Sequence, residues 1–363
     1  MQLLLIAAVG LLSYANGAND NFKGVATLWG AGRTSYWRAL SWATAFTFLG
    51  SLVAIGTASG LISKFNGSNF VSADVYMQVP FLAAVALGGA ATVLLASRLG
   101  LPISTTHALT GALVGVGVTA AGFSGVRFVA LGSGVVLPLL FSPFVALALT
   151  LGVYPLMARL ARSRDCVCIE DSPAVALAPD GAAAMESIGA PPVVRVARAS
   201  ECNTGTEVIR GSVMDILHWL SGAGISFARG LNDTPKIAAV LLVAASAAVK
   251  LDYALVAVAM AMGGMLGAAR VAQTMSKQIT PMATEEAVGA NLVAASLVTL
   301  ASIFALPVST THVTSGSIFG IGWNRRDEAD WKRVREILFS WVGTLPLGAA
   351  LGSILYLLLV RLA

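Results

Sequence analysis

A short motif that pairs a carboxylate with an amide and a lysine occurs twice in this apolar chain. It reads Gly-x-Asn-Asp followed by Lys, first at 17–23 and again at 230–236. An aspartate inside a membrane costs about 2.5–3.5 kcal/mol on insertion scales, so such a residue is typical of a functional site. Carboxylate and amide oxygens are ligands for hard cations, and a buried carboxylate can also bind a proton. We predict that a coupling cation binds at Asn19, Asp20, Asn232 and Asp233, with Lys23 and Lys236 either neutralising this site or extending toward an interface.

A second motif, Pro-x-Ser-Thr-Thr-His, also occurs twice, at 102–107 and 307–312. Proline suits the first turn of a helix and Ser or Thr suits its N-cap, so each motif predicts a helix start. Free N–H groups and hydroxyls at such a start favour an anion, although simple capping is the alternative. The duplication favours an oxyanion site formed by Asp20, Ser104, Thr105, Thr106, Asp233, Ser309, Thr310 and Thr311. His107 and His312 are interpreted as hydrogen-bonded helix-start residues in preference to a proton relay.

The surroundings of these motifs predict an all-α polytopic membrane protein. The 363 residues are 56% hydrophobic and 11% charged, and apolar runs near the length of a membrane span recur along the chain. A β-barrel would alternate polar and apolar residues in short segments, and these runs do not. The formal charge of +5 lies mainly in loops, which favours positive-inside orientation over nucleic-acid binding.

The two motifs belong to an internal duplication. Asp20 and Asp233 are separated by 233 − 20 = 213 residues, and Ser104 and Ser309 by 309 − 104 = 205. Flanking glycines, serines and lysines keep these offsets, which indicates two repeats with a shortened loop in the second. The predicted domains are a first transmembrane repeat at 1–158, a polar linker at 159–211 and a second repeat at 212–363.

Basic residues occupy different loops in the two halves, which predicts repeats of inverted topology. Arg33 and Arg38 follow the first apolar segment, whereas the equivalent loop of the second half, near Lys250, is poor in charge. The second half has its basic cluster at 325–335, just before the last span. This swap predicts a cytoplasmic linker with both termini outside. In inverted repeats, broken or re-entrant helices form a site near the bilayer midplane, so we expect a helix break at each Gly-x-Asn-Asp motif.

The combined motifs predict coupled transport. Two aspartates and an oxyanion repel each other strongly at low dielectric unless cations lie between them. The anion then binds well only together with its cations, which is the thermodynamic basis of symport. An intramembrane enzyme is disfavoured, because neither a His-Glu-x-x-His zinc motif nor a Gly-x-Ser-x-Gly nucleophile motif occurs. No cofactor is expected, and no metal other than the coupling cation.

The two Gly-x-Asn-Asp and two Pro-x-Ser-Thr-Thr-His motifs resemble those of the inorganic phosphate transporter family. The resemblance implies an inverted-repeat secondary transporter that imports phosphate with sodium, or alternatively protons, by alternating access. It implies that the matched Asp and Ser-Thr-Thr residues line the sites, and it suggests a homodimer in a bacterial or archaeal inner membrane. Some relatives carry an acidic residue late in the second span of each repeat, where this chain has Gly60 and Gln273. This departure leaves the coupling ion open.

Three other transport hypotheses remain open from the sequence. They are a sulfate permease, a permease for another oxyanion, and an anion channel. A carboxylate that accepts a hydrogen bond from protonated phosphate favours phosphate over sulfate, and broken helices in inverted repeats are typical of alternating access rather than of a channel.

Overall fold

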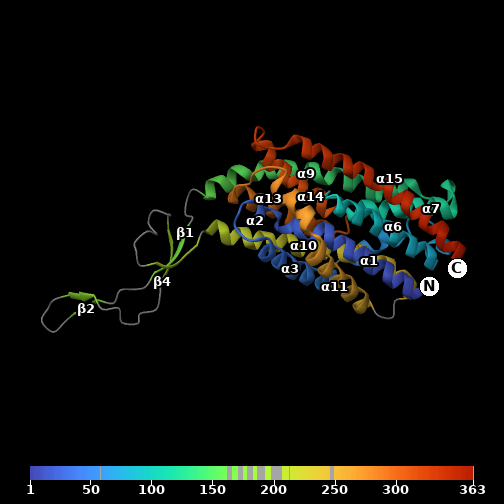
Figure 1. Ribbon diagram of the computed structural model, residues 1–363, viewed down its shortest axis with the longest axis horizontal. Coiled ribbons are helices and arrows are strands. Elements are labelled where there is room, and N and C mark those ends of the chain that lie inside the picture. Colours follow the sequence, from blue (N-terminus) through green and yellow to red (C-terminus); the bar gives the residue numbers. More distant parts are fainter. Residues whose placement is uncertain are drawn as a thin grey trace.

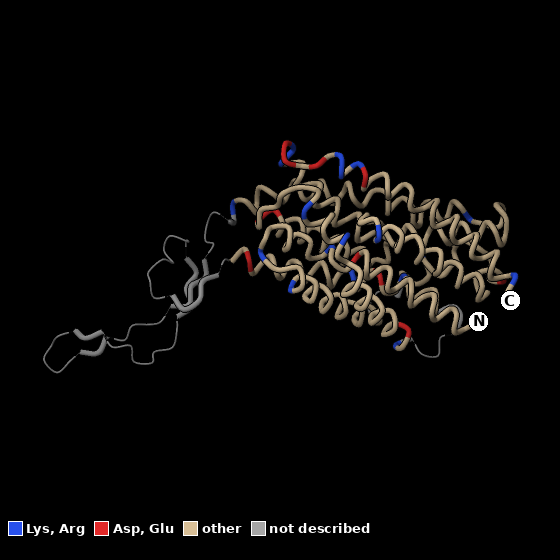
Figure 2. Tube along the Cα trace, in the orientation of Figure 1, with Lys and Arg blue, Asp and Glu red and all other residues tan. Residues whose placement is uncertain are grey.

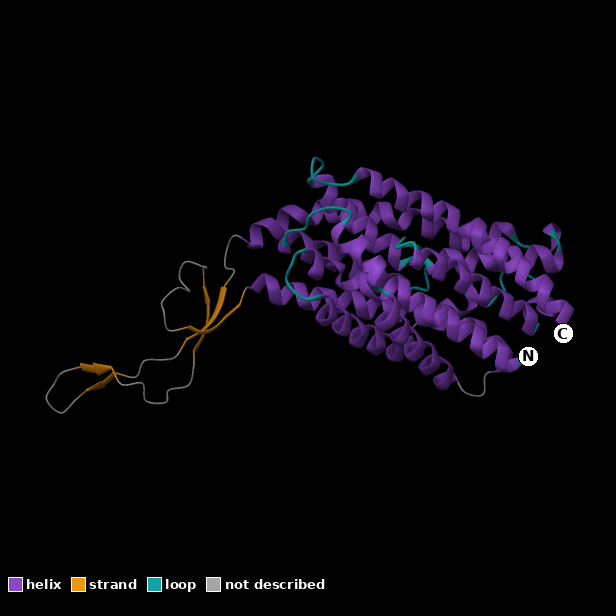
Figure 3. Cartoon of the chain, viewed as in Figure 1, coloured by secondary structure: helices purple, strands orange, loops and turns teal. Residues whose placement is uncertain are grey.

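The computed structural model describes a helical bundle and a separate segment with short strands (Figure 3). It describes residues 1–57, 59–161, 166–170, 175–177, 183–185, 193–197, 207–211, 213–245 and 249–362. The prediction of an all-α membrane part is confirmed, because the residues on either side of the linker form helices and connecting loops.

The helices before the linker are α1 (Gln2–Asp20), α2 (Ala26–Gly30), α3 (Tyr36–Thr57), α4 (Ile62–Phe65), α5 (Ala73–Tyr76), α6 (Val79–Arg98), α7 (Thr105–Ala121), α8 (Phe128–Leu131) and α9 (Leu137–Ala161). Short 3-10 turns cover Asn21–Val25, Ser59–Leu61 and Phe123–Gly125, and a π-helical turn covers Gly132–Val136. The helices after the linker are α10 (Val213–Ala245), α11 (Val249–Gly267), α12 (Ala269–Lys277), α13 (Thr284–Ile303), α14 (Thr310–Asn324) and α15 (Trp331–Leu362).

The predicted linker contains five short strands in its described residues. They are β1 (Cys166–Glu170), β2 (Val175–Leu177), β3 (Ala183–Met185), β4 (Val193–Ala197) and β5 (Glu207–Gly211). β1 pairs antiparallel with β4 and β5, and β2 pairs antiparallel with β3. Residues 159–161 of the predicted linker form the end of α9, and its other residues lie outside the described part.

Within the described residues, six helical segments are long and apolar enough to cross a membrane. They include α3, α6, α11, α13 and α15, together with a segment from α8 through α9. Figure 1 shows the helices as one elongated bundle, with both chain termini at the end opposite the linker segment. In the same view α1 begins at the terminal end and α10 begins at the linker end, so the two helices run in opposite directions.

Equivalent helices of the two halves make reciprocal contacts with the other half. α1 packs along α11, and α10 packs along α3, which are corresponding pairs under the 213-residue offset. Glycines permit both contacts: a Cβ at Gly17 would overlap the carbonyl oxygen of Met260, and one at Gly230 would overlap that of Thr47. Because Met260 and Thr47 are also 213 residues apart, the reciprocal contacts extend the duplication from sequence to packing. Small residues of this kind let membrane helices approach closely.

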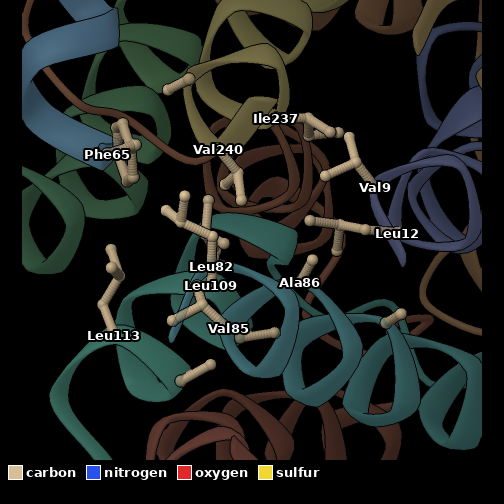
Figure 4. Close-up of a cluster of buried hydrophobic side chains, with 14 of the residues drawn as sticks. Val9, Leu12, Phe65, Leu82, Val85, Ala86, Leu109, Leu113, Ile237 and Val240 are labelled. Atoms are coloured by element: carbon tan, nitrogen blue, oxygen red, sulfur yellow. The ribbon is translucent and has the colours of Figure 1, made fainter. Parts of the chain in front are cut away.

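The centre of the bundle is filled by apolar side chains from both halves (Figure 4). In this view Ile237 and Val240 of α10 lie opposite residues of α1, α6 and α7, such as Leu12, Leu82 and Leu109. All five side chains are buried. This packing holds α10 against the first repeat and so brings the two Asn-Asp pairs into one region.

The two Ser-Thr-Thr motifs begin helices inside the bundle, as predicted. Ser104 caps α7 by accepting a hydrogen bond from the His107 backbone N–H at 3.1 Å, and Ser309 caps α14 in the same way with His312 at 3.2 Å. α6 and α7 therefore form a hairpin with its tip at residues 99–104, and α13 and α14 form the equivalent hairpin with its tip at 304–309.

The predicted helix break occurs in only one Gly-x-Asn-Asp motif. α1 ends at Asp20 and continues as a 3-10 turn over Asn21–Val25, whereas α10 runs unbroken through Asn232 and Asp233. The prediction of a break in the second copy is wrong. In both copies the polar side chains find partners on the hairpin of their own repeat, so these side chains do not require an open backbone, and α10 stays continuous.

Candidate functional site

Five charged side chains lie together in the apolar centre of the bundle. They are Asp20, Lys23, Arg229, Asp233 and Lys236, and each is at most 3% exposed. Figure 2 shows most other charged residues toward the ends of the bundle and its loops. Charges at this depth are retained only when they are paired and hydrogen-bonded.

The first half of the cluster is centred on Asp20 and Lys23. Lys23 forms an ion pair with Asp20 and also donates to Asn19 Oδ1 at 2.8 Å. Its Nζ then reaches the first hairpin at the Ile103 carbonyl oxygen, 2.9 Å away, and the second hairpin at Thr311 Oγ1, 2.6 Å away. One lysine thus connects the end of α1 to both hairpins.

The second half repeats this arrangement with the hairpins exchanged. Lys236 Nζ lies 3.6 Å from Asp233 Oδ1 and donates to the Val308 carbonyl oxygen at 2.6 Å and to Thr106 Oγ1 at 3.1 Å. Val308 belongs to the second hairpin and Thr106 to the first. Both lysines are buried, so the interpretation that they extend to an interface is wrong. Each lysine instead pairs with the aspartate three positions before it, and the supporting role predicted for them stays a prediction.

The other motif residues occupy equivalent places in the two halves. Thr105 donates to Asp20 Oδ2 at 3.3 Å, and Thr310 donates to Asp233 Oδ2 at 3.3 Å. Each Asn-Asp asparagine is held by a serine of the adjacent hairpin, through the pairs Asn19–Ser97 at 2.9 Å and Asn232–Ser302 at 3.2 Å. All the residues predicted for the oxyanion and cation sites therefore lie in or beside the cluster. Ser104 and Ser309 do so as helix caps rather than as direct partners of the charged groups.

Sequence reasoning missed two residues of the cluster, Asn16 and Arg229. Asn16 Nδ2 donates to Asp20 Oδ2 at 3.0 Å and lies 3.4 Å from Asp233 Oδ2, so one amide bridges the two carboxylates. Arg229 donates to Asn16 Oδ1 at 2.5 Å and lies 3.7 Å from Asp233 through Nε. A signal was present, because each residue precedes its aspartate by four positions, which places both on the same helix face.

His107 and His312 face each other between the two hairpins. Their ring centroids are 4.4 Å apart, and both side chains are buried. Each backbone N–H is hydrogen-bonded to its capping serine, as the helix-start interpretation predicts.

The hairpin tips are contacted by the segments that follow the second helix of the opposite repeat. Thr274 of α12 donates to the Gly100 carbonyl oxygen at 2.8 Å, and Arg270 donates to that of Arg98. Gly60, at the position equivalent to Gln273, lies so close to Ala305 of the second tip that a Cβ there would be 2.7 Å from the Ala305 Cβ. Gly60 and Gln273 thus lie beside the hairpin tips and outside the charge cluster.

A small cavity adjoins the cluster. It is lined by Asn16, Thr105, Thr106, Leu109, Asp233, Lys236 and Ile237, and about 10 Å³ is available to the centre of a water molecule. This is close to the space that one water requires. A tetrahedral oxyanion therefore does not fit in this cavity as it stands.

Comparisons with known proteins identify a family for this chain. Residues 16–352 match the model of the phosphate transporter family. A protein of Bacillus subtilis described as a "Probable low-affinity inorganic phosphate transporter" is 23% identical over 361 residues, covering 99% of this chain and 97% of the relative. A protein of Mycobacterium bovis with the same description is 26% identical over 368 residues, covering 98% of this chain and 77% of the relative.

The fold is also known from a solved structure. The chain superposes on "The sodium-dependent phosphate transporter" with a TM-score of 0.77 at 19% identity, covering 100% of this chain and 99% of that one. At this identity the likeness concerns the fold alone. Relatives come from archaea as well as bacteria, for example from Thermococcus kodakarensis at 27% identity. These relatives are transporters, in agreement with the prediction that the chain is not an enzyme.

The family match covers most of the chain, including the buried charge cluster and the first turns of α7 and α14. This membrane protein therefore belongs to the phosphate transporter family.

Proposed function

We propose that the chain imports inorganic phosphate in symport with monovalent cations, sodium in preference to protons, by alternating access. One observation carries this proposal: the first turns of α7 and α14, which belong to different repeats, contact the same buried charge cluster. Thr106 of α7 contacts Lys236, and Thr311 of α14 contacts Lys23. A site held at once by both repeats changes whenever one repeat moves against the other, which is the geometric requirement of alternating access.

Phosphate would bind between the helix starts of α7 and α14. Their hydroxyls and free N–H groups are suited to an oxyanion, and the helix dipoles add to the attraction. The donors proposed for this role are Ser104, Thr105, Thr106, Ser309, Thr310 and Thr311, with Asp20 and Asp233 accepting hydrogen bonds from protonated phosphate oxygens. The threonine hydroxyls now contact Asp and Lys side chains, so phosphate would have to replace these contacts as it enters.

The coupling cation would bind at the oxygens of Asp20 with Asn19 and of Asp233 with Asn232. These are the hard oxygen ligands that sodium prefers, and each carboxylate can alternatively take up a proton. Each lysine now lies beside these oxygens, so a cation would bind as the lysine turns toward the incoming anion. This exchange would couple the two ligands, because each lysine can neutralise either its aspartate or the anion, and an aspartate left by its lysine needs the cation.

Phosphate uptake into reconstituted vesicles tests the proposal. Labelled phosphate should accumulate when an inward sodium gradient is imposed, and more weakly or not at all with a proton gradient alone. Uptake that ignores both gradients would exclude symport and favour a channel. Equal inhibition of uptake by phosphate and by sulfate would exclude phosphate selectivity.

We also propose inverted repeats with a cytoplasmic linker, external termini and a homodimeric assembly. The opposite directions of α1 and α10 support the inversion. All three cysteines, Cys166, Cys168 and Cys202, belong to the linker, so a membrane-impermeant maleimide reports its side without any substitution. With a cytoplasmic linker, the reagent should label inverted vesicles and leave intact cells unlabelled. The opposite result would show that the linker lies outside. Crosslinking or mass measurement in detergent tests the dimer.

A further inference from the structure

The buried charge cluster departs from the symmetry of the repeats at one position. Asn16 and Arg229 are equivalent, since 229 − 16 = 213, yet one is neutral and the other carries a permanent charge. The remaining charged members are matched, with Asp20 and Lys23 in the first repeat equivalent to Asp233 and Lys236 in the second.

Arg229 is held firmly in this place. Its Nη2 donates to Asn16 Oδ1 at 2.5 Å, and its Nη1 donates to Asn21 Oδ1 at 3.1 Å and to Thr47 Oγ1 at 3.3 Å. Its Nε, 3.7 Å from Asp233 Oδ2, makes no hydrogen bond with the described residues. Arg229 does not line the cavity, but its partners Asn16 and Asp233 do, so its charge acts on the cavity through them.

The fixed charge of the cluster follows from these residues. Three cationic groups and two carboxylates give a formal sum of 3 − 2 = +1. Without Arg229 the sum would be zero. Hydrogen phosphate carries two negative charges, so a neutral loaded site needs one monovalent cation when Arg229 is present and two when it is absent. In a medium of low dielectric, leaving one charge uncompensated is strongly unfavourable.

We propose that Arg229 is a built-in counter-cation that takes the place of one coupling ion. This inference rests on the proposed cation symport and adds the number of ions to it. Arg229 is a positioning and charge-setting residue, since it does not touch the cavity. The alternative is that Arg229 only ties α10 to Asn16, Asn21 and Thr47, in which case its charge would not matter.

Three variants separate charge from structure. Arg229→Gln removes the charge and keeps part of the hydrogen bonding. Asn16→Asp adds a carboxylate beside Arg229. It therefore also brings the fixed charge of the cluster to zero, while Arg229 stays in place. Arg229→Lys keeps the charge but loses the forked contacts. The control is Arg33→Gln, which removes an arginine whose side chain is 48% exposed and pairs with Asp215.

The measurement is the number of sodium ions moved per phosphate, obtained in vesicles from the phosphate gradient that just balances an imposed sodium gradient. We expect Arg229→Gln and Asn16→Asp each to raise this number by one, and to raise the KM for phosphate at limiting sodium at least tenfold. Arg229→Lys and Arg33→Gln should keep the wild-type number.

An unchanged number in the folded Arg229→Gln protein would overturn the inference, as would a raised number in Arg229→Lys. If Arg229→Gln does not fold, Asn16→Asp decides: a raised number supports the inference and an unchanged number overturns it. A wild-type protein whose uptake ignores cation gradients would instead refute the proposed symport, so the two failures are distinguishable.

Discussion

Replacing Asp20 by asparagine should leave the Lys23 charge buried without its carboxylate. Lys23 is 3% exposed, and after the change its remaining acceptors are Asn19 Oδ1, the Ile103 carbonyl and Thr311 Oγ1, at 2.6–2.9 Å. These are neutral, so hydrogen bonding survives but charge pairing does not. Breaking a buried ion pair on one side costs about 3–5 kcal/mol. Because three acceptors remain, we expect the low end, about 3 kcal/mol, or roughly two powers of ten in the folding equilibrium.

The assay is thermal unfolding of the purified protein in detergent, read by tryptophan fluorescence, together with phosphate uptake in vesicles. Asp20→Asn should insert into the membrane, unfold at a lower temperature and lose gradient-driven uptake. Adding Lys23→Met removes the unpaired charge, so the double variant should regain at least half of the lost stability while uptake stays absent. Asp74→Asn, at an exposed aspartate of the short helix α5, is the control and should change neither property.

Two results would refute this reasoning. One is an Asp20→Asn protein that is as stable as the wild type. The other is a double variant no more stable than the single one, which would show that the loss did not come from the unpaired lysine. Full uptake by Asp20→Asn would separately remove this carboxylate from the transport site, and the same criterion applies to Asp233→Asn.

The remaining predictions concern the helix starts, the helix contacts and the hairpin tips. Ser104→Ala and Ser309→Ala each remove a helix cap and should destabilise the protein by about 1 kcal/mol, seen as a lower unfolding temperature; no shift in either would contradict the capping role. Gly17→Ala should strongly reduce the yield of folded protein, because the added Cβ would overlap the Met260 carbonyl, whereas Gly10→Ala, with no atom within 4 Å of its Cβ, should be tolerated. Thr274→Val removes the hydrogen bond to the first hairpin tip and should increase the reactivity of a cysteine introduced at that tip; unchanged reactivity would show that this contact does not hold the tip closed.

Much of the site could be predicted from the duplication. Asp20 and Asp233 are expensive to bury, so finding both in register already indicated one shared region. The capping roles of Ser104 and Ser309 followed from local chemistry, because a proline and a serine before an apolar stretch favour a helix start wherever it lies. These inferences needed no knowledge of long-range packing.

Other features depended on contacts between distant residues. The continuous helix at Asn232 could not be foreseen, because the two asparagines make equivalent contacts, Asn19 with Ser97 and Asn232 with Ser302, and yet only the first copy is followed by a 3-10 turn. The contact of each lysine with the hairpin of the other repeat could not be predicted either, because Lys23 and Thr311 are 288 residues apart in the sequence.

The sequence by itself determined the membrane class, the two repeats and four of the five charged residues of the cluster, because these follow from composition and regular spacing. Only the tertiary structure decided how those charges are compensated. It placed Asn16 and Arg229 in contact, so that the net charge of the site became a property of two repeats packed together rather than of either motif. The physical reason is that the cost of desolvating a charge can be read from the side-chain type, whereas electrostatic pairing depends on distance, and distance is set by the fold.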